Sequence, residues 1–125
     1  MRTTNVTALL SLLALLTFAP FAYASDWSAL LKDKALTDFN DEDIQQHLDA
    51  VHALLDAPLP AKREWTNPRT GAGARLEVIG QPSIDGFSEC RRVRTNVYTP
   101  KHKAEARTWT ACRGSDGQWS LVKGT

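Results

Sequence analysis

The sequence predicts an α+β domain, with an N-terminal helix or helices packed on a five-stranded antiparallel β-meander that contains one disulfide. Apolar residues recur at helical spacing before Pro58, and they alternate with polar residues after Pro60. Two cysteines fall where they would face each other across a predicted hairpin. For a chain of 125 residues, one small domain with a modest core is expected.

The N-terminus has the layout of a secretory signal peptide. A basic start at Arg2 precedes an apolar run over residues 6–19, a proline, and a small-x-small cleavage signal that ends at Ala24. We therefore expect a signal peptide over 1–24 and a single domain over 25–125, with no transmembrane segment after cleavage. A membrane anchor is the alternative, but the apolar run is short for a bilayer and a proline interrupts it. A lipoprotein-type anchor is not expected, because no cysteine lies near the cut.

Two helices are predicted between the cleavage site and Pro58. Residues 25–36 favour a short helix, and a longer one follows Asn40, which is a good N-cap residue. The apolar stripe of the longer helix consists of Ile44, Leu48, Val51 and Leu55, with Leu54 beside it. Three acids, Asp41 to Asp43, occupy its first turn, where the helix dipole favours negative charge. Paired catalytic acids are the alternative interpretation, but no nucleophile or base accompanies them, so capping is preferred.

Five strands are predicted after Pro60. The first contains Trp65, and a turn rich in Asn, Pro and Gly leads to the second, which contains Leu76 and Val78. A loop follows over residues 80–86. The remaining strands are expected over 87–98, 104–112 and 118–123, separated by the turn 99–103 and by Asp116-Gly117.

The hairpin formed by the third and fourth strands sets the position of the cysteines. If the hairpin is centred on Lys101, Cys90 lies opposite Cys112, and opposed strand residues approach closely enough for a disulfide. An oxidising compartment favours the bond, and closing a loop of about 20 residues adds roughly 3 kcal/mol of stability. One face of the hairpin should carry Val93, Val97, Trp109 and Ala111, and the other the two cysteines with Arg92, Arg94, Thr108 and Thr110.

No catalytic, cofactor-binding or metal-binding residues are expected, and the protein is not expected to be an enzyme. Cysteine catalysis would need a nearby base, but His102 falls in the hairpin turn, at the far end of the strand from Cys112. His47 and His52 are five residues apart on a helix, which does not place them on one face, and no acid or cysteine completes a metal-ligand set.

Charge divides the domain into an acidic and a basic part. Residues 25–59 hold eight acids and two lysines, whereas residues 60–125 hold twelve Lys or Arg and six acids. The two parts can lie against each other within one domain, or the basic part can meet an anionic partner such as lipopolysaccharide, peptidoglycan or nucleic acid. The candidate anion-binding residues are Arg91, Arg92, Arg94, Lys101 and Lys103. The alternative is a solvated strand whose charges prevent edge-to-edge pairing.

Four segments occur in an order that resembles a known family. They are "LTDFNDEDIQQHLDAVHALL", "REWTNPRTGAGARLEVIG", "ECRRVR" and "TACRGSDGQWSLV". Together they resemble the C-terminal domain of the bacterial seventeen-kilodalton surface antigens, over about Leu36 to Val122. The matching residues are Trp65, Asn67, Thr70, Gly71, Cys90, Arg91, Ala111, Cys112, Arg113, Asp116, Gly117 and Trp119.

The resemblance implies a cell-envelope domain without established enzymatic activity, in the periplasm or associated with the outer membrane. This chain lacks the lipoprotein cysteine and the glycine-zipper membrane segment of that family. We expect a non-enzymatic domain that binds an envelope partner, either a protein or an anionic glycan, and no nucleic acid. The alternative hypothesis is a periplasmic inhibitor of an envelope hydrolase such as lysozyme, acting through the loop 80–86 or the turn 99–103.

Overall fold

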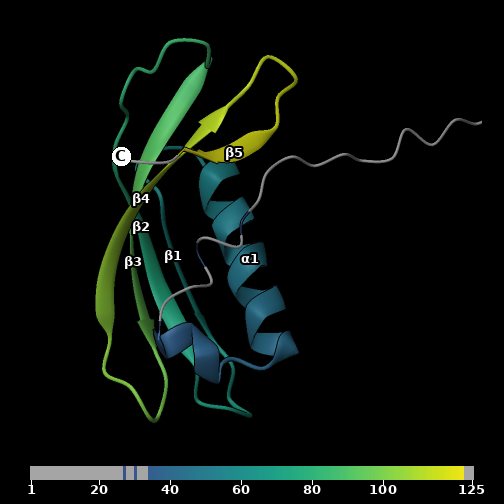
Figure 1. Ribbon diagram of the computed structural model, residues 1–125, viewed down its shortest axis with the longest axis vertical. Helices are drawn as coiled ribbons and strands as arrows, with labels where there is room; N and C mark the ends of the chain where they lie inside the picture. The colour runs from purple at the N-terminus through teal and green to yellow at the C-terminus, as the bar shows by residue number, and fades with distance from the viewer. Residues whose placement is uncertain (1–26, 28–29, 31–33, 123–125) are drawn as a thin grey trace, which may run out of the picture.

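One α-helix packs across one face of a five-stranded antiparallel sheet (Figure 1). The structure is a computed structural model, and it describes Trp27, Leu30 and residues 34–122. The signal peptide predicted over 1–24 lies outside these residues, as does most of the short helix predicted over 25–36. In chain order the elements are η2 (Lys34–Asp38), α1 (Asp41–Asp56), β1 (Lys62–Thr66), β2 (Gly73–Gly80), β3 (Glu89–Tyr98), β4 (Glu105–Arg113) and β5 (Trp119–Val122).

The start of α1 is fixed by a capping box, which confirms Asn40 as the N-cap. The Asn40 side chain accepts a hydrogen bond from the backbone N–H of Asp43 at 2.8 Å, and the Asp43 carboxylate accepts one from the backbone N–H of Asn40 at 3.1 Å. At the other end, the helix stops at Asp56, before Pro58.

The buried face of α1 is rotated from the predicted stripe. Val51, Leu54 and Leu55 are fully buried as expected, but Ile44 and Leu48 are only partly buried. Their expected places are taken by two polar residues, Asp43 and His47, which are 0% and 2% exposed. Ile44 still packs against the core, so the predicted stripe was incomplete: it counted only apolar residues, whereas buried polar side chains are accepted when they have hydrogen-bond partners.

The sheet has the simple order β1-β2-β3-β4-β5, which confirms the predicted meander. The predicted hairpin register is also confirmed, since Cys90 pairs with Cys112 and Val93 pairs with Trp109. A bulge at Ile79 shifts the β2–β3 register between Val78 and Gly80.

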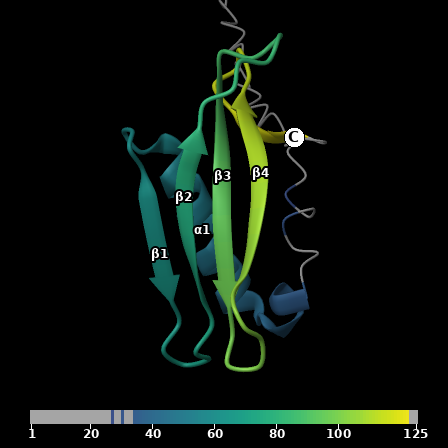
Figure 2. The ribbon, with the colours of Figure 1, turned by 90° about the vertical axis from the view of Figure 1, so that its left-hand side faces the viewer.

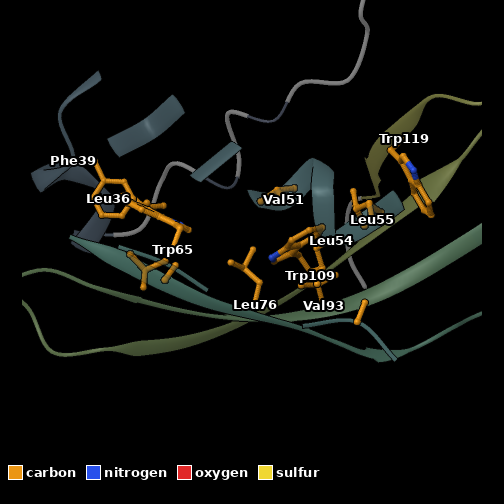
Figure 3. Close-up of a cluster of buried hydrophobic side chains, with 14 of the residues drawn as sticks. Leu36, Phe39, Val51, Leu54, Leu55, Trp65, Leu76, Val93, Trp109 and Trp119 are labelled. Atoms are coloured by element: carbon orange, nitrogen blue, oxygen red, sulfur yellow. The ribbon is translucent and has the colours of Figure 1, made fainter. Parts of the chain in front are cut away.

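The core lies between α1 and one face of the sheet. Figure 3 shows Val51 and Leu54 of α1 facing Leu76, Val93 and Trp109 of the sheet. Trp65, Trp109 and Trp119 are all buried, as predicted for these three tryptophans. Trp27 adds to this core from the N-terminal side, where its ring meets that of Trp109 edge to face at 6.2 Å.

No helix or strand of the described chain packs across the other face of the sheet, although Cys90, Thr110 and Cys112 on it are buried. Figure 2 looks onto this face, with β1 to β4 side by side and α1 behind them. We call it the helix-free face. Its outward residues on the three strands β1 to β3 are Lys62, Glu64, Thr66, Gly73, Arg75, Glu77, Cys90, Arg92, Arg94, Asn96 and Tyr98.

Candidate functional site

Cys90 and Cys112 form the predicted disulfide between β3 and β4. The two residues lie directly opposite each other with their Cα atoms 4.0 Å apart, and both are buried. A disulfide-bonded sulfur has no thiol to ionise, and these are the two cysteines of the sequence. The segment around Cys112 therefore has an architectural role rather than that of a reactive thiol.

The residues after Cys112 attach the last two strands to the end of α1. Arg113 Nη2 and Trp119 Nε1 both donate to Asp56 Oδ1, at 3.1 and 3.0 Å. The Arg113 guanidinium lies 4.7 Å from the centre of the Trp119 ring, a favourable cation–π distance. Between them, Gly117 takes φ +79, which a residue with a side chain rarely adopts, so the Asp-Gly turn needs its glycine.

Arg91 is separated from the other candidate anion-binding residues. It lies on the sheet face that packs against α1, and it is 6% exposed. Its Nη1 donates to the carbonyl oxygens of Leu54 and Ala57 at 3.0 and 2.8 Å, and its Nε donates to Glu89 at 3.1 Å. Both carbonyls lie at the C-terminus of the helix, where the Leu54 carbonyl also accepts the backbone N–H of Ala57 at 3.3 Å. Arg91 thus caps α1, and its guanidinium is not available to a partner.

A buried polar joint connects the start of α1 to the β1–β2 turn. Asp43 Oδ1 accepts from Asn67 Nδ2 at 2.7 Å and from Thr70 Oγ1 at 2.8 Å. Asn67 is 1% exposed and also donates to Glu42 at 2.8 Å. Gly71, with φ +75, lets the chain reverse directly after Thr70. The Trp-x-Asn-x-x-Thr-Gly pattern of the sequence is therefore a docking turn for the helix.

His47 continues this joint along α1. Its Nδ1 accepts a hydrogen bond from Trp65 Nε1 at 3.0 Å, and the ring also meets Trp65 and Phe39 edge to face. Burial lowers the pKa of His47 from 6.5 to about 4, so the ring is neutral at pH 7. A neutral, hydrogen-bonded histidine within the core stabilises packing and has no access to a substrate.

The sequence offered one signal for this joint that apolar periodicity does not use. Asp43 stands three residues after Asn40, which is the spacing of a capping box, and His47 follows one helical turn later on the same face. The partners Asn67 and Thr70 are 24 and 27 residues away from Asp43 along the chain. Their meeting depends on the tertiary fold, so local sequence reasoning missed it.

Arg92 and Arg94 point outward from β3 on the helix-free face, as predicted. Both are exposed, and neither forms an ion pair with any residue in the part of the chain that the structure describes. Directly opposite them on β4 are Thr110 and Thr108. Beside Arg94, a shallow hollow of about 450 Å³ lies over β1 to β3, with Lys62 and Glu77 among its lining residues.

Lys101 and Lys103 lie in the turn between β3 and β4, at the opposite end of the hairpin from the disulfide. Both are exposed. Arg94 and Tyr98, where β3 ends, are already about 13 Å apart at roughly 3.3 Å per strand residue. The five candidate residues therefore divide into a buried cap, an outward arginine pair on the sheet, and a distant pair of turn lysines.

The described part of the chain contains neither a metal-ligand cluster nor a membrane-spanning helix. Within 34–122 and at the two described residues before them, no group of His, Cys, Asp or Glu could hold a metal ion. Over these same positions no helix has the length and apolar character that crossing a bilayer requires.

Together these features define the class of protein: a small disulfide-containing α+β domain with one helix on an antiparallel meander. A family model described as 17 kDa outer membrane surface antigen matches residues 52–120, more than half of the 125 residues. The protein therefore belongs to this family. The match includes the twelve residues named for the resemblance, from Trp65 to Trp119, whereas most of the helix segment that precedes them lies outside it. The description associates the domain with the outer membrane surface. No match was found among curated proteins or among solved structures.

Proposed function

We propose that this protein is an exported, non-enzymatic envelope domain that binds an anionic envelope glycan through the helix-free face of its sheet. One observation carries the proposal: Arg92 and Arg94 are exposed on that face without an ion-pair partner in the described chain. Arginines that face solvent in adjacent outward positions of one strand are well placed to bind an acidic polymer.

The non-enzymatic part of the proposal is supported by the partners of the buried reactive side chains. The cysteines are bonded to each other, Asp43 is bound by Asn67 and Thr70, and His47 is bound by Trp65. None of these groups lies at a surface where a substrate could reach it. A hydrolytic or redox turnover abolished by a single surface substitution would overturn this part.

The charges on the two sides of the protein favour binding of an anionic glycan to the sheet rather than to the helix. The helix α1 contains five acids and no lysine or arginine. On the helix-free face, four cations (Lys62, Arg75, Arg92 and Arg94) outnumber two acids (Glu64 and Glu77). An anionic polymer would be repelled by the acidic α1 side and attracted to the opposite face.

The test measures retention of the oxidised protein on immobilised lipopolysaccharide at increasing NaCl. Replacing Arg92 and Arg94 by Ser should weaken binding about tenfold at low salt, because two of the cations in contact are lost. Replacing Lys101 and Lys103 by Ser removes the same charge from the turn and should leave most of the binding. Equal losses in the two double variants would show a general charge effect and overturn the proposed face.

The same assay separates a glycan partner from a protein partner. Binding to purified lipopolysaccharide free of protein is expected under the proposal. If binding occurred only with envelope fractions that contain protein, and survived digestion of the glycan, a protein partner would replace the glycan.

Inhibition of an envelope hydrolase is a second candidate, favoured by the β2–β3 loop. This loop extends beyond the strands at one end of the sheet (Figure 1), and Phe87 within it is 37% exposed. Gly86 has φ +90 with open space around its Cα, so the loop tip is unobstructed. A loop of this kind can enter the cleft of a hydrolase. Full lysozyme activity in the presence of micromolar oxidised protein would exclude this function for lysozyme.

A further inference from the structure

We infer that the group recognised by the helix-free face is a phosphate on the saccharide of an outer-membrane glycolipid, held by Arg92, Arg94 and Thr108. This inference rests on the proposed function and names its ligand class. It is carried by the arrangement of two neighbouring Arg–Thr pairs across β3 and β4.

The two pairs lie side by side on one face. In the β3–β4 ladder, Arg92 is directly opposite Thr110 and Arg94 is directly opposite Thr108. Strand residues two apart point to the same side and are about 7 Å from each other. Guanidinium groups on side chains of that length can therefore converge on one bound group.

The threonines place hydroxyl groups beside the arginines. Thr108 is exposed, whereas Thr110 is fully buried and its Oγ1 has no hydrogen-bond partner in the described chain. Buried polar atoms in folded proteins nearly always have a partner. Because Thr110 Oγ1 has almost no accessible surface, a bound phosphate would contact the exposed Thr108 hydroxyl rather than this one.

The neighbours on β2 determine where an anion can settle. Arg92 is opposite Gly80, which has no side chain, whereas Arg94 is opposite Glu77. Glu77 is also directly opposite Lys62 on β1, so a carboxylate is already present over β2. The site is consequently open at Arg92 and, on the β4 side, at the exposed Thr108.

A phosphate fits this set of donors better than a carboxylate. Each guanidinium donates two parallel hydrogen bonds, and a carboxylate with two oxygens is filled by one such fork. A phosphate monoester offers three terminal oxygens, which can accept from two arginines and a hydroxyl together. Both cations of the pair are arginines, the residue suited to such bidentate contacts, and neither is lysine.

The surroundings favour a saccharide over a nucleic acid or an acyl chain. The outward residues that flank the pairs are the disulfide on one side and Asn96 with Ala106 on the other. No aromatic side chain stands among them to stack a base. The same flat polar surface has no apolar ridge that would enter a bilayer, so the headgroup sugar is the part it can bind.

The test compares deep-rough lipopolysaccharide before and after chemical removal of its phosphates, by isothermal titration calorimetry with the full oxidised protein. Loss of the phosphates should weaken binding at least about tenfold. Replacing both Arg92 and Arg94 by Lys keeps the charge but removes the paired hydrogen bonds that each guanidinium can donate. The preference for the phosphorylated form should then fall to about twofold. Arg63→Lys, on the other face of the sheet, should keep the wild-type preference.

Each outcome decides a separate part of the inference. Equal binding before and after dephosphorylation would show that phosphate is not the recognised group. The proposed binding of an anionic glycan would then still hold. Equal binding to polygalacturonate, a carboxylate polymer, would also exclude phosphate as the recognised group. If the protein bound phosphatidylglycerol vesicles as tightly as the glycolipid, the saccharide would not be part of the recognised group. If it bound none of these ligands, the proposed function itself would be wrong. The melting temperature and oxidised mass of each variant show whether it is folded.

Discussion

His47 lies between α1 and β1, and its neutral form is built into the contact. It is 2% exposed and accepts the Trp65 Nε1 hydrogen at 3.0 Å, which a protonated Nδ1 cannot do. Because burial lowers its pKa to about 4 in the folded protein, the unfolded chain, with a pKa of 6.5, binds the proton first as the pH falls. The contribution of His47 to stability is complete above pH 6.5 and decreases between pH 6.5 and 4.

We predict that the free energy of unfolding decreases by up to about 3 kcal/mol over this pH range because of His47 alone. His47→Gln keeps an acceptor for Trp65 but does not titrate, so its stability should depend less on pH. Urea unfolding at pH 7 and pH 5 measures the difference. His52→Gln, an exposed position on the same helix, should retain the wild-type pH dependence. An unchanged slope in His47→Gln would show that another group causes the acid sensitivity.

Asp43 is the residue on which the attachment of the turn depends. It is 0% exposed and accepts from Asn67, Thr70 and the Asn40 backbone. We predict that Asp43→Ala lowers the free energy of unfolding by about 3 kcal/mol, because it leaves buried donors unpaired. Asp49→Ala, exposed on the same helix, should change it by less than about 0.5 kcal/mol.

A double-mutant cycle with Asn67→Ala tests whether Asp43 acts through this contact. Coupling above about 1 kcal/mol is expected for two residues in one buried hydrogen-bond network. If the two substitutions were additive, the cost of Asp43→Ala would come from helix capping alone, and the joint would not stabilise the fold.

At the level of elements, the C-terminus of α1 is capped by a side chain from the sheet. No basic residue occurs in its last turn, and Arg91 of β3 supplies the positive charge and the donors instead. We predict that Arg91→Lys lowers the free energy of unfolding by about 2 kcal/mol, because one ammonium cannot reproduce the fork that joins Leu54, Ala57 and Glu89. Hydrogen exchange should also become faster in the last turn of α1.

The neighbouring residue provides the control for this prediction. Arg92→Lys changes the same side chain one position along β3, on the exposed face, and should leave stability within about 0.5 kcal/mol of wild type. Similar losses for the two variants would mean that strand propensity, and not capping of α1, explains the effect.

The elements also show how far the sequence alone can lead. Alternation along β3 and β4, together with a centre at Lys101, was sufficient for the register and the disulfide, because a period of two leaves few pairings that bury one face. Apolar periodicity located α1 but left Asp43 and His47 out of its buried face, because these two residues are buried through partners on other elements. Arg91 was grouped with Arg92 by composition, although the same alternation places neighbouring residues on opposite faces.

At the level of the whole molecule, the acidic helix and the basic face lie on opposite sides of the sheet. The outer surface of α1 carries Asp41 and Asp49, both exposed, and α1 has no basic residue. The helix-free face is turned away from these acids, as Figure 2 shows. Charges separated by more than about 10 Å are largely screened at 0.1 M salt, so a ligand on the sheet is influenced mainly by the charges of that face. Net charge near neutrality thus conceals a face that attracts anions.

This separation leads to a prediction that net charge alone would not make. Glu64→Gln with Glu77→Gln removes two acids from the helix-free face, and Asp41→Asn with Asp49→Asn removes two from α1. The net charge changes equally, but only the first pair frees cations on the binding face, since Glu64 pairs with Arg75 at 3.3 Å and Glu77 lies opposite Lys62 and Arg94. Binding to lipopolysaccharide at 0.1 M salt should become about threefold to tenfold tighter in the sheet variant and change less than about twofold in the helix variant. Equal increases in affinity in the two variants would show that binding depends on the total charge of the protein. The helix-free face would then not be the binding surface.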